Sequence, residues 1–223
     1  SERIWDGRSV SHATRPVPAD PRRPGMTLDA FRPAIVVVGS ASRDLVDDDP
    51  RGWRLGGGVS YSALTTARLG IATGAIVGVD AEAATASELD LLRDAGVDVR
   101  LVPLAHGPVF VNIERPEGRL QLCGDRSDPV PVDTVPDAWR SAPGWILAPV
   151  AAELPPAWAA FPSDEAFVAV GWQGLLRELE ADQPVRHVAP RPDPIIARAD
   201  LVGLSRDDVE RDVVLADLYA LLR

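Results

Sequence analysis

An uninterrupted apolar run near residue 35 constrains the fold of this chain more than any other feature. Residues 34–39 read Ala-Ile-Val-Val-Val-Gly, with no polar side chain among them. A strand with one face in water alternates apolar and polar residues, whereas a strand covered on both faces is apolar throughout. The run therefore predicts a buried strand in a parallel sheet that has helices on both faces.

Helical patterns and further apolar runs alternate after this strand. Val59, Ala63 and Ala67 recur at helical spacing, and Gly70 is placed to end that helix. A second helix is expected from Asp80 to Ala95, with Leu91 and Leu92 on its apolar face. Further strands are expected at 72–79, 97–102, 145–148, 166–170, 185–188 and 201–204, and a last helix at 206–222. The alternation predicts an α/β domain of three layers, α/β/α, with a Rossmann-like sheet.

One segment departs from this alternation. Residues 109–114 and 119–123 alternate with period two around Arg115-Pro116-Glu117-Gly118, which predicts a β-hairpin at about 108–124. A hairpin inserted into a βα series suggests a small lid. Residues 1–33 are expected to be a disordered or peripheral leader, because their proline-rich part suits neither a helix nor a core strand. Residues 34–223 form the expected domain.

Composition excludes several classes of function. The 23 basic residues are all Arg and the chain carries 33 acidic residues, so its net charge is −10. Without Lys there is no Walker lysine and no Schiff-base lysine, and the single Cys123 excludes a four-cysteine zinc site. The acidic balance argues against nucleic-acid binding. No apolar stretch reaches the length of a membrane span and no signal peptide is evident, so a cytoplasmic, membrane-free protein is expected.

Two local features are candidates for a ligand site. Gly56-Gly57-Gly58 precedes the first expected helix, where it either allows an oxygen-rich ligand to approach the helix start or simply forms a tight turn. Asp44 follows the first strand, at the sheet edge where ligands bind, and is either a ligand-binding group or a turn residue. The serine-hydrolase pattern is incomplete, because Ser62 stands where a nucleophile elbow requires Gly.

Together these segments resemble the ribokinase-like (PfkB-type) carbohydrate kinases. Gly39-Ser40-Ala41-Ser42-Arg43-Asp44 is similar to that family's first-strand signature, which ends in a substrate-binding aspartate. Gly56-Gly57 followed by Ala67-Arg68-Leu69-Gly70 resembles its di-glycine motif and helix, and residues 109–123 stand where those kinases carry a β lid. Residues 171–177 resemble a D-x-Q-G-x-x-R segment, and residues 199–208 the strand that leads into an N-x-x-E motif.

The resemblance implies phosphorylation of a hydroxyl group on a small sugar, polyol or nucleoside, with ATP and Mg²⁺ as cofactors. It assigns substrate binding to Asp44, Gly56, Gly57, Tyr61 and Gln173, cofactor binding to Ser205 and Asp208, and magnesium to Asp208. It also implies a homodimer formed through the lid hairpin.

The departures from the family pattern define an alternative. Tyr61 and Ser205 stand where Asn is frequent, and the G-A-G-D motif that supplies the catalytic Asp does not occur in these 223 residues. The base Asp is therefore expected beyond Arg223, and no catalytic residue is assigned within the chain. The domain is expected to be incomplete at its C-terminal side and inactive by itself, holding mainly the acceptor-binding half. The alternative is a non-catalytic ligand-binding or regulatory α/β domain that has lost the kinase site.

Overall fold

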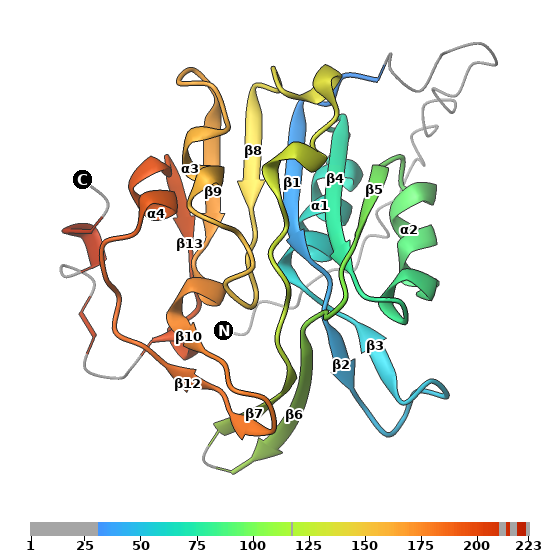
Figure 1. The fold of residues 1–223 in the computed structure, drawn as a ribbon, viewed down its shortest axis with the longest axis vertical. Helices are drawn as coiled ribbons and strands as arrows, with labels where there is room; N and C mark the ends of the chain where they lie inside the picture. Colours follow the sequence, from blue (N-terminus) through green and yellow to red (C-terminus); the bar gives the residue numbers. More distant parts are fainter. Residues whose placement is uncertain (1–30, 117, 210–212, 215–217, 222–223) are drawn as a thin grey trace, which may run out of the picture.

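A six-stranded parallel sheet forms the centre of the computed structural model, which describes residues 31–116, 118–209, 213–214 and 218–221 (Figure 1). Its strand order is β13-β9-β8-β1-β4-β5, and every neighbouring pair is parallel. The strands are β1 (Ile35–Ser40), β4 (Thr73–Val79), β5 (Asp98–Pro103), β8 (Gly144–Leu147), β9 (Phe167–Gly171) and β13 (Leu201–Gly203). The buried strand expected from residues 34–39 is β1, which lies inside the sheet between β8 and β4.

The alternating side chains of β1 enter two separate apolar cores. Val37 packs with Val59 and Ala63 of α1, whereas Val36 and Val38 pack on the opposite face. The first face carries α1 (Gly58–Arg68) and α2 (Glu88–Asp94); the second carries α3 (Ala157–Ala160), α4 (Pro194–Arg198) and short 3₁₀ turns at Val132–Thr134 and Asp137–Trp139. The fold is thus the expected three-layer α/β/α arrangement.

Tryptophans fill the core on the second face. Trp145 and Trp172 are 0% and 1% exposed and belong to this core. Trp139 and Trp158 lie in the same core. On the α1 face, by contrast, Phe167 of β9 and Leu201 of β13 are 51% and 57% exposed, because α1 and α2 lie over the other end of the sheet (Figure 1).

A second, five-stranded sheet forms the lid, in the order β11-β7-β6-β2-β3. The expected hairpin is present as β6 (Val109–Arg115) and β7 (Gly118–Asp125). The other lid strands are β2 (Arg43–Leu45), β3 (Trp53–Leu55) and β11 (Gln183–Pro184). These strands escaped sequence analysis, because two or three residues carry no period and acidic loop residues flank β2.

Three sequence predictions were wrong in detail. The helix expected from Asp80 begins only at Glu88, after a 3₁₀ turn (Ala83–Thr85), and it buries Leu89 and Leu92 while Leu91 is exposed. The strand expected at 185–188 is the two-residue β12 (Arg186–His187), which pairs with β10 (Arg177–Glu178) outside the main sheet. Where a helix was expected at 206–222, the described residues form a 3₁₀ turn at Arg206–Asp208, are not helical at 213–214 and are helical at 218–219.

Both ends of the chain lie outside the described residues. This holds for residues 1–30 of the expected leader and for residues 222–223, so the end of the expected domain at Arg223 is not described. Within the part of the chain that the structure describes, no helix is long and apolar enough to cross a membrane.

An ion-pair network ties the base of the lid to α2. Arg51, in the loop between β2 and β3, donates hydrogen bonds of 2.8 and 2.7 Å to the two carboxylate oxygens of Glu88, and it also pairs with Asp49. The backbone N–H of Leu55 donates to Glu88 as well. The bond from Arg51 lowers the pKa of Glu88 to about 2, and Arg51 also lowers the pKa of Asp49. Asp49 is therefore part of a paired network with Arg51 and Glu88.

The Glu88 network predicts a pH-dependent contribution to stability. Because the folded pKa of Glu88 lies below the ordinary value near 4.5, its stabilisation is present above pH 4.5 and is lost as the pH falls toward 2. We expect Glu88→Gln to lower the free energy of unfolding by about 1–2 kcal/mol at pH 7 and by much less at pH 3, measured by urea denaturation. Glu165→Gln, at an exposed carboxylate, is the matched control; an equal loss at both pH values for Glu88→Gln would contradict the assignment.

Candidate functional site

The candidate residues gather at the carboxyl end of the parallel strands. The chain leaves β1 into β2 at this edge, and the segments after β9 and β13 carry Gln173 and Ser205–Asp208 to the same side. In open parallel sheets this edge is where ligands bind, because the strand ends and helix starts leave backbone groups available there. The lid strands extend from it (Figure 1).

The two glycines before α1 make a close contact with the end of β1. Gly56 and Ser42 exchange backbone hydrogen bonds of 2.8 and 3.3 Å. Gly57 has φ +96, and a Cβ built on it would lie 2.6 Å from the carbonyl oxygen of Ser40. Only glycine allows this approach. The backbone at Gly56–Gly58 thus forms the tight turn that was one of the two interpretations of the sequence. The same turn places the start of α1 against the end of β1.

The carboxylate of Asp44 lies beside Ser42 and Gly56. Its Oδ1 accepts a 3.0 Å hydrogen bond from Ser42 Oγ, and a Cβ on Gly56 would lie 2.5 Å from its Oδ2. The structure thus brings together Asp44, Gly56 and Gly57, three of the residues assigned to the substrate. A carboxylate held in this way can accept hydrogen bonds from hydroxyl groups of a sugar or polyol.

A second group of expected site residues forms one hydrogen-bond network. Gln173 donates from Nε2 to Oδ1 of Asp208 at 2.7 Å, and the backbone N–H of Ser205 donates to Oδ2 at 2.7 Å. The Ser205 side chain also accepts from the Asp207 N–H, and Ser205 and Asp208 form a capping box. Gln173, assigned to the substrate, thus contacts Asp208, one of the two residues assigned to the cofactor, and orients its carboxylate.

Arg177 lies between the two groups and was given no role from the sequence. Its side chain is 10% exposed, its Nη2 lies 3.9 Å from Asp208 Oδ1, and its guanidinium stands 5.7 Å from the ring centre of Phe110. Phe110 pairs with Asp44 in the register of β6 with β2. Burial lowers the pKa of Arg177, and the charges of Asp208 and Asp44 oppose that change. The sequence signal was its place as the arginine of the segment that resembles D-x-Q-G-x-x-R, four residues after Gln173.

Glu153 is a second group that sequence analysis missed. Its buried carboxylate accepts hydrogen bonds from the backbone N–H groups of Ser40, Val150 and Ala151, at 2.8, 3.0 and 2.8 Å. Burial raises the pKa of Glu153, and the N–H donors oppose the rise. Because all of these contacts are within the protein, Glu153 supports the end of β1 rather than a ligand. A lone acid in the apolar stretch 148–156 was the available signal.

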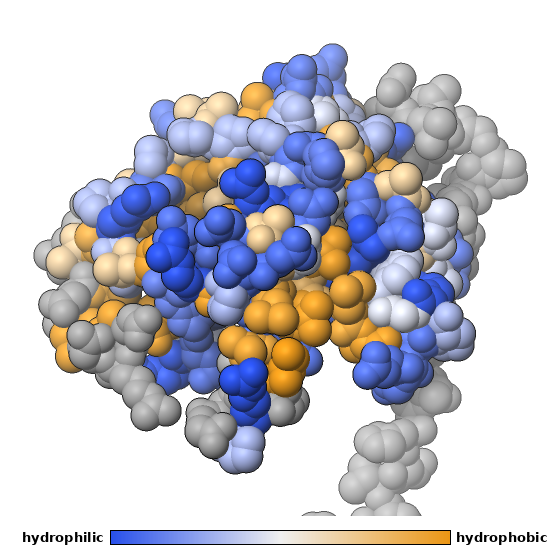
Figure 2. Space-filling model, turned by 60° about the horizontal axis from the view of Figure 1, so that its bottom comes forward, coloured by the Kyte–Doolittle hydropathy of each residue, from blue (hydrophilic) through white to orange (hydrophobic). Residues whose placement is uncertain are grey.

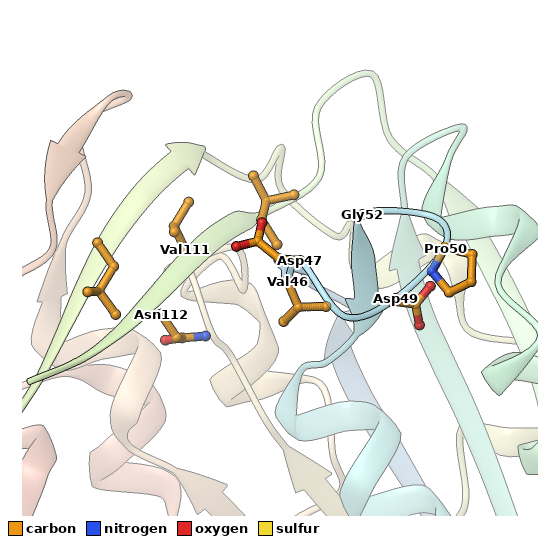
Figure 3. Close-up of a pocket in the computed structure, with 9 residues that line it drawn as sticks. Val46, Asp47, Asp49, Pro50, Gly52, Val111 and Asn112 are labelled. Carbon is orange, nitrogen blue, oxygen red and sulfur yellow. The ribbon is translucent and has the colours of Figure 1, made fainter.

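Tyr61 lies apart on the flank of α1. It is 63% exposed and borders a shallow hollow with Ser62, Thr65, Thr66 and Ile146. A larger open hollow of about 860 Å³ lies on the lid, between the loop after β2 and the strand β6 (Figure 3). Its lining residues are Leu45, Val46, Asp47, Asp49, Pro50, Gly52, Val111, Asn112 and Ile113.

The donor set near Asp208 does not suit direct magnesium coordination. Among the described residues there is no group of three or more His, Cys, Asp or Glu side chains that could hold a metal ion. Mg²⁺ prefers several oxygen ligands in octahedral geometry, whereas Asp208 is a single carboxylate with a guanidinium beside it. The magnesium role of Asp208 therefore stays a prediction from the family resemblance.

The catalytic base also stays a prediction. It is expected beyond Arg223, and Arg223 itself lies outside the described residues. The described part of the site thus holds the groups assigned to the acceptor and to the cofactor, and no residue of it is assigned to proton removal.

Comparison with solved structures shows a ribokinase-like fold. A pyrophosphate-dependent kinase in the ribokinase family, solved with a pyrophosphate analog and myo-inositol, matches with a TM-score of 0.59 and 22% identity over 75% of this chain and 60% of that chain. Fructokinase from Xylella fastidiosa matches with a TM-score of 0.51 and 16% identity, over 76% and 58% of the two chains. No protein-family model matches the sequence, and no curated protein is significantly similar to it.

The match covers only part of each known structure. The chain spans about 60% of the length of the kinase with the pyrophosphate analog and 56% of ribokinase from Giardia lamblia, which matches with a TM-score of 0.50 and 12% identity. At these identities the likeness establishes the fold, and the activity needs its own argument.

The glycine contact predicts a large difference between two similar substitutions. Gly52 and Gly57 both have positive φ, but a Cβ on Gly52 would meet nothing within 4 Å, whereas one on Gly57 would meet the Ser40 carbonyl. We expect Gly52→Ala to cost about 1 kcal/mol from backbone strain alone, and Gly57→Ala to cost about 2 kcal/mol or more. Urea denaturation of both variants checks this. Equal losses would show that the approach of α1 to β1 tolerates a side chain.

Proposed function

We propose that this chain provides the acceptor site of a kinase that phosphorylates a hydroxyl group of a small sugar, polyol or nucleoside. The observation that carries the proposal is the placement of Asp44 in the lid strand β2, where Ser42 and Gly56 hold it at the carboxyl edge of the parallel sheet. The similar solved structures support the same class, because they include a fructokinase and a kinase solved with myo-inositol.

Each part of the site has a role in such a reaction. Asp44 accepts hydrogen bonds from acceptor hydroxyls and so fixes which hydroxyl faces the donor. The lid strands cover the acceptor and exclude water, which limits hydrolysis of the donor. Transfer further requires a base and donors for the developing charge; the family's G-A-G-D motif, which supplies both, does not occur in these residues.

We propose ATP with Mg²⁺ as the phosphoryl donor, following the family resemblance. A bound nucleotide would bring the magnesium ion with its own phosphate oxygens, which suits a protein with few metal ligands at the site. Pyrophosphate is the competing donor, because one similar solved kinase is described as pyrophosphate-dependent. The alternative function, a binding domain without catalysis, is favoured by Tyr61 and Ser205, which stand where the family frequently has Asn, and by the exposure of Tyr61.

Acceptor binding is the direct test of the proposed function. We expect the 223-residue chain to bind at least one uncharged compound from a panel of myo-inositol, ribose, fructose, ribitol and adenosine in isothermal titration calorimetry. Asp44→Asn should weaken that binding about tenfold or more, because the amide replaces one acceptor oxygen by a donor. Asp137→Asn, on an exposed 3₁₀ turn of the second face, is the matched control. Binding of none of the panel would contradict the proposal.

Turnover separates the kinase from the binding domain. We expect no ADP and no phosphate release from this chain with ATP or with pyrophosphate, because the catalytic motif is missing from its residues. Acceptor-dependent ADP formation by the chain itself would contradict this expectation. If a longer form that carries the motif binds the acceptor but does not transfer phosphate, the binding-domain alternative is correct.

We also propose that two copies pair through their lids. Apolar residues gather at the lid end of the molecule (Figure 2), where Val111 and Ile113 are only half-buried and border the hollow of Figure 3. Val109 of the same strand is only 7% exposed and packs inside. A paired lid would cover the Val111 face and remove the exposed edge of a short sheet.

Lid pairing predicts a change of mass in solution. Val111→Asp should convert a dimer to a monomer in sedimentation equilibrium, because it would bury a charge at the centre of the interface. Tyr219→Asp, on an exposed residue outside the lid, should leave the mass unchanged. A wild-type chain that is monomeric at all concentrations tested would contradict the pairing.

A further inference from the structure

Arg177 carries a buried positive charge whose hydrogen-bonding groups are not satisfied within the protein. Its side chain is nine-tenths buried, and its Nε has no hydrogen-bond partner among the described residues. The distance of 3.9 Å from Nη2 to Asp208 Oδ1 is an ion pair but exceeds hydrogen-bond length. A buried guanidinium normally has its N–H groups paired, so one left open at a sheet edge points to a ligand.

The neighbouring carboxylate already has other donors. Asp208 accepts from Gln173 on one oxygen and from the Ser205 N–H on the other, each at 2.7 Å. Those two bonds orient Asp208 without involving Arg177. Asp208 therefore offsets the charge of the guanidinium without occupying its N–H groups.

The other side of Arg177 is apolar. The guanidinium lies 5.7 Å from the ring centre of Phe110, which is 2% exposed and pairs with Asp44 in the lid sheet. A buried aromatic ring beside a guanidinium limits how that group can turn. The fork of N–H groups of Arg matches the spacing of two oxygens on a carboxylate or phosphate.

From this placement we propose that Arg177 binds a small oxyanion, a phosphoryl or phosphate group, through the N–H groups of its guanidinium. The inference deepens the proposed function and rests on it for the identity of the site. The oxyanion has two possible sources, the group delivered by the phosphoryl donor and an acidic substituent on the acceptor itself. Both present the same oxygens to the guanidinium.

Calorimetric titration of the whole 223-residue chain with inorganic phosphate, and separately with pyrophosphate, tests the proposal. We expect Arg177→Gln to weaken binding of the anion about tenfold or more, since both the charge and the fork are lost. Arg177→Lys keeps a cation and should bind more weakly than wild type, which also covers the case in which Arg177→Gln does not fold. Thermal melting of each variant establishes that it is folded.

Arg100→Gln is the matched control. Arg100 also lies near a ring, 5.6 Å from that of Trp139, and pairs with Asp98. Its buried Nε likewise has no hydrogen-bond partner among the described residues, but Arg100 belongs to the edge strand β5 and not to the candidate site. The control substitution should leave phosphate binding unchanged. Absence of phosphate and pyrophosphate binding in the wild type, or wild-type affinity in folded Arg177→Lys, would overturn the proposal.

A repeat titration with a bound neutral polyol distinguishes the two sources. Phosphate that binds together with the polyol is in the place of the donor's phosphoryl group, whereas phosphate that competes with it occupies the place of an acidic substituent. Either result supports the oxyanion site. If the chain binds phosphate through Arg177 but binds no neutral acceptor, the oxyanion site is supported and the proposed function is contradicted.

Discussion

The contact between Gly56–Gly57 and the end of β1 is the constraint on which the rest of the site depends. The paired backbone bonds of Ser42 and Gly56 fix the turn from the parallel sheet into the lid, and the start of α1 follows at Gly58. Because no side chain intervenes, Asp44 occupies the space that a Cβ on Gly56 would fill. One close approach thus fixes a helix, the lid and a carboxylate relative to one another.

The central sheet and the lid hairpin could be predicted from the sequence, because each of their strands has a recognisable pattern within its own few residues. A strand buried on both faces is apolar at every position, and a half-buried hairpin alternates, so β1 and the pair β6–β7 were recognisable one at a time. The first turn of α2 was misplaced because Asp80 caps the 3₁₀ turn by accepting from the Ala83 N–H, and also pairs with Arg43 of the lid. Asp80 is a residue type that often caps α-helices, but here it contacts the 3₁₀ turn and Arg43.

The candidate site was predictable only in part. Asp44, Gly56 and Gly57 are close to one another in the sequence, so short sequence motifs were enough to predict that they lie in one site. The contact from Gln173 to Asp208 joins the ends of two strands 35 residues apart, and no sequence pattern encodes which donor meets which acceptor. Arg177 and Glu153 differ from other charged residues only in being buried, which is decided by the packing of the whole sheet.

The position of Phe110 links the two parts of the site. It belongs to β6, whose parallel pairing with β2 holds it opposite Asp44, and its ring lies beside the guanidinium of Arg177. Arg177 in turn lies beside Asp208, which the segment after β13 holds in place. A displacement of the lid strands would therefore alter the acceptor carboxylate and the surroundings of the buried cation together. Acceptor binding and oxyanion binding would then be coupled through shared lid contacts, without any direct contact between the two ligands.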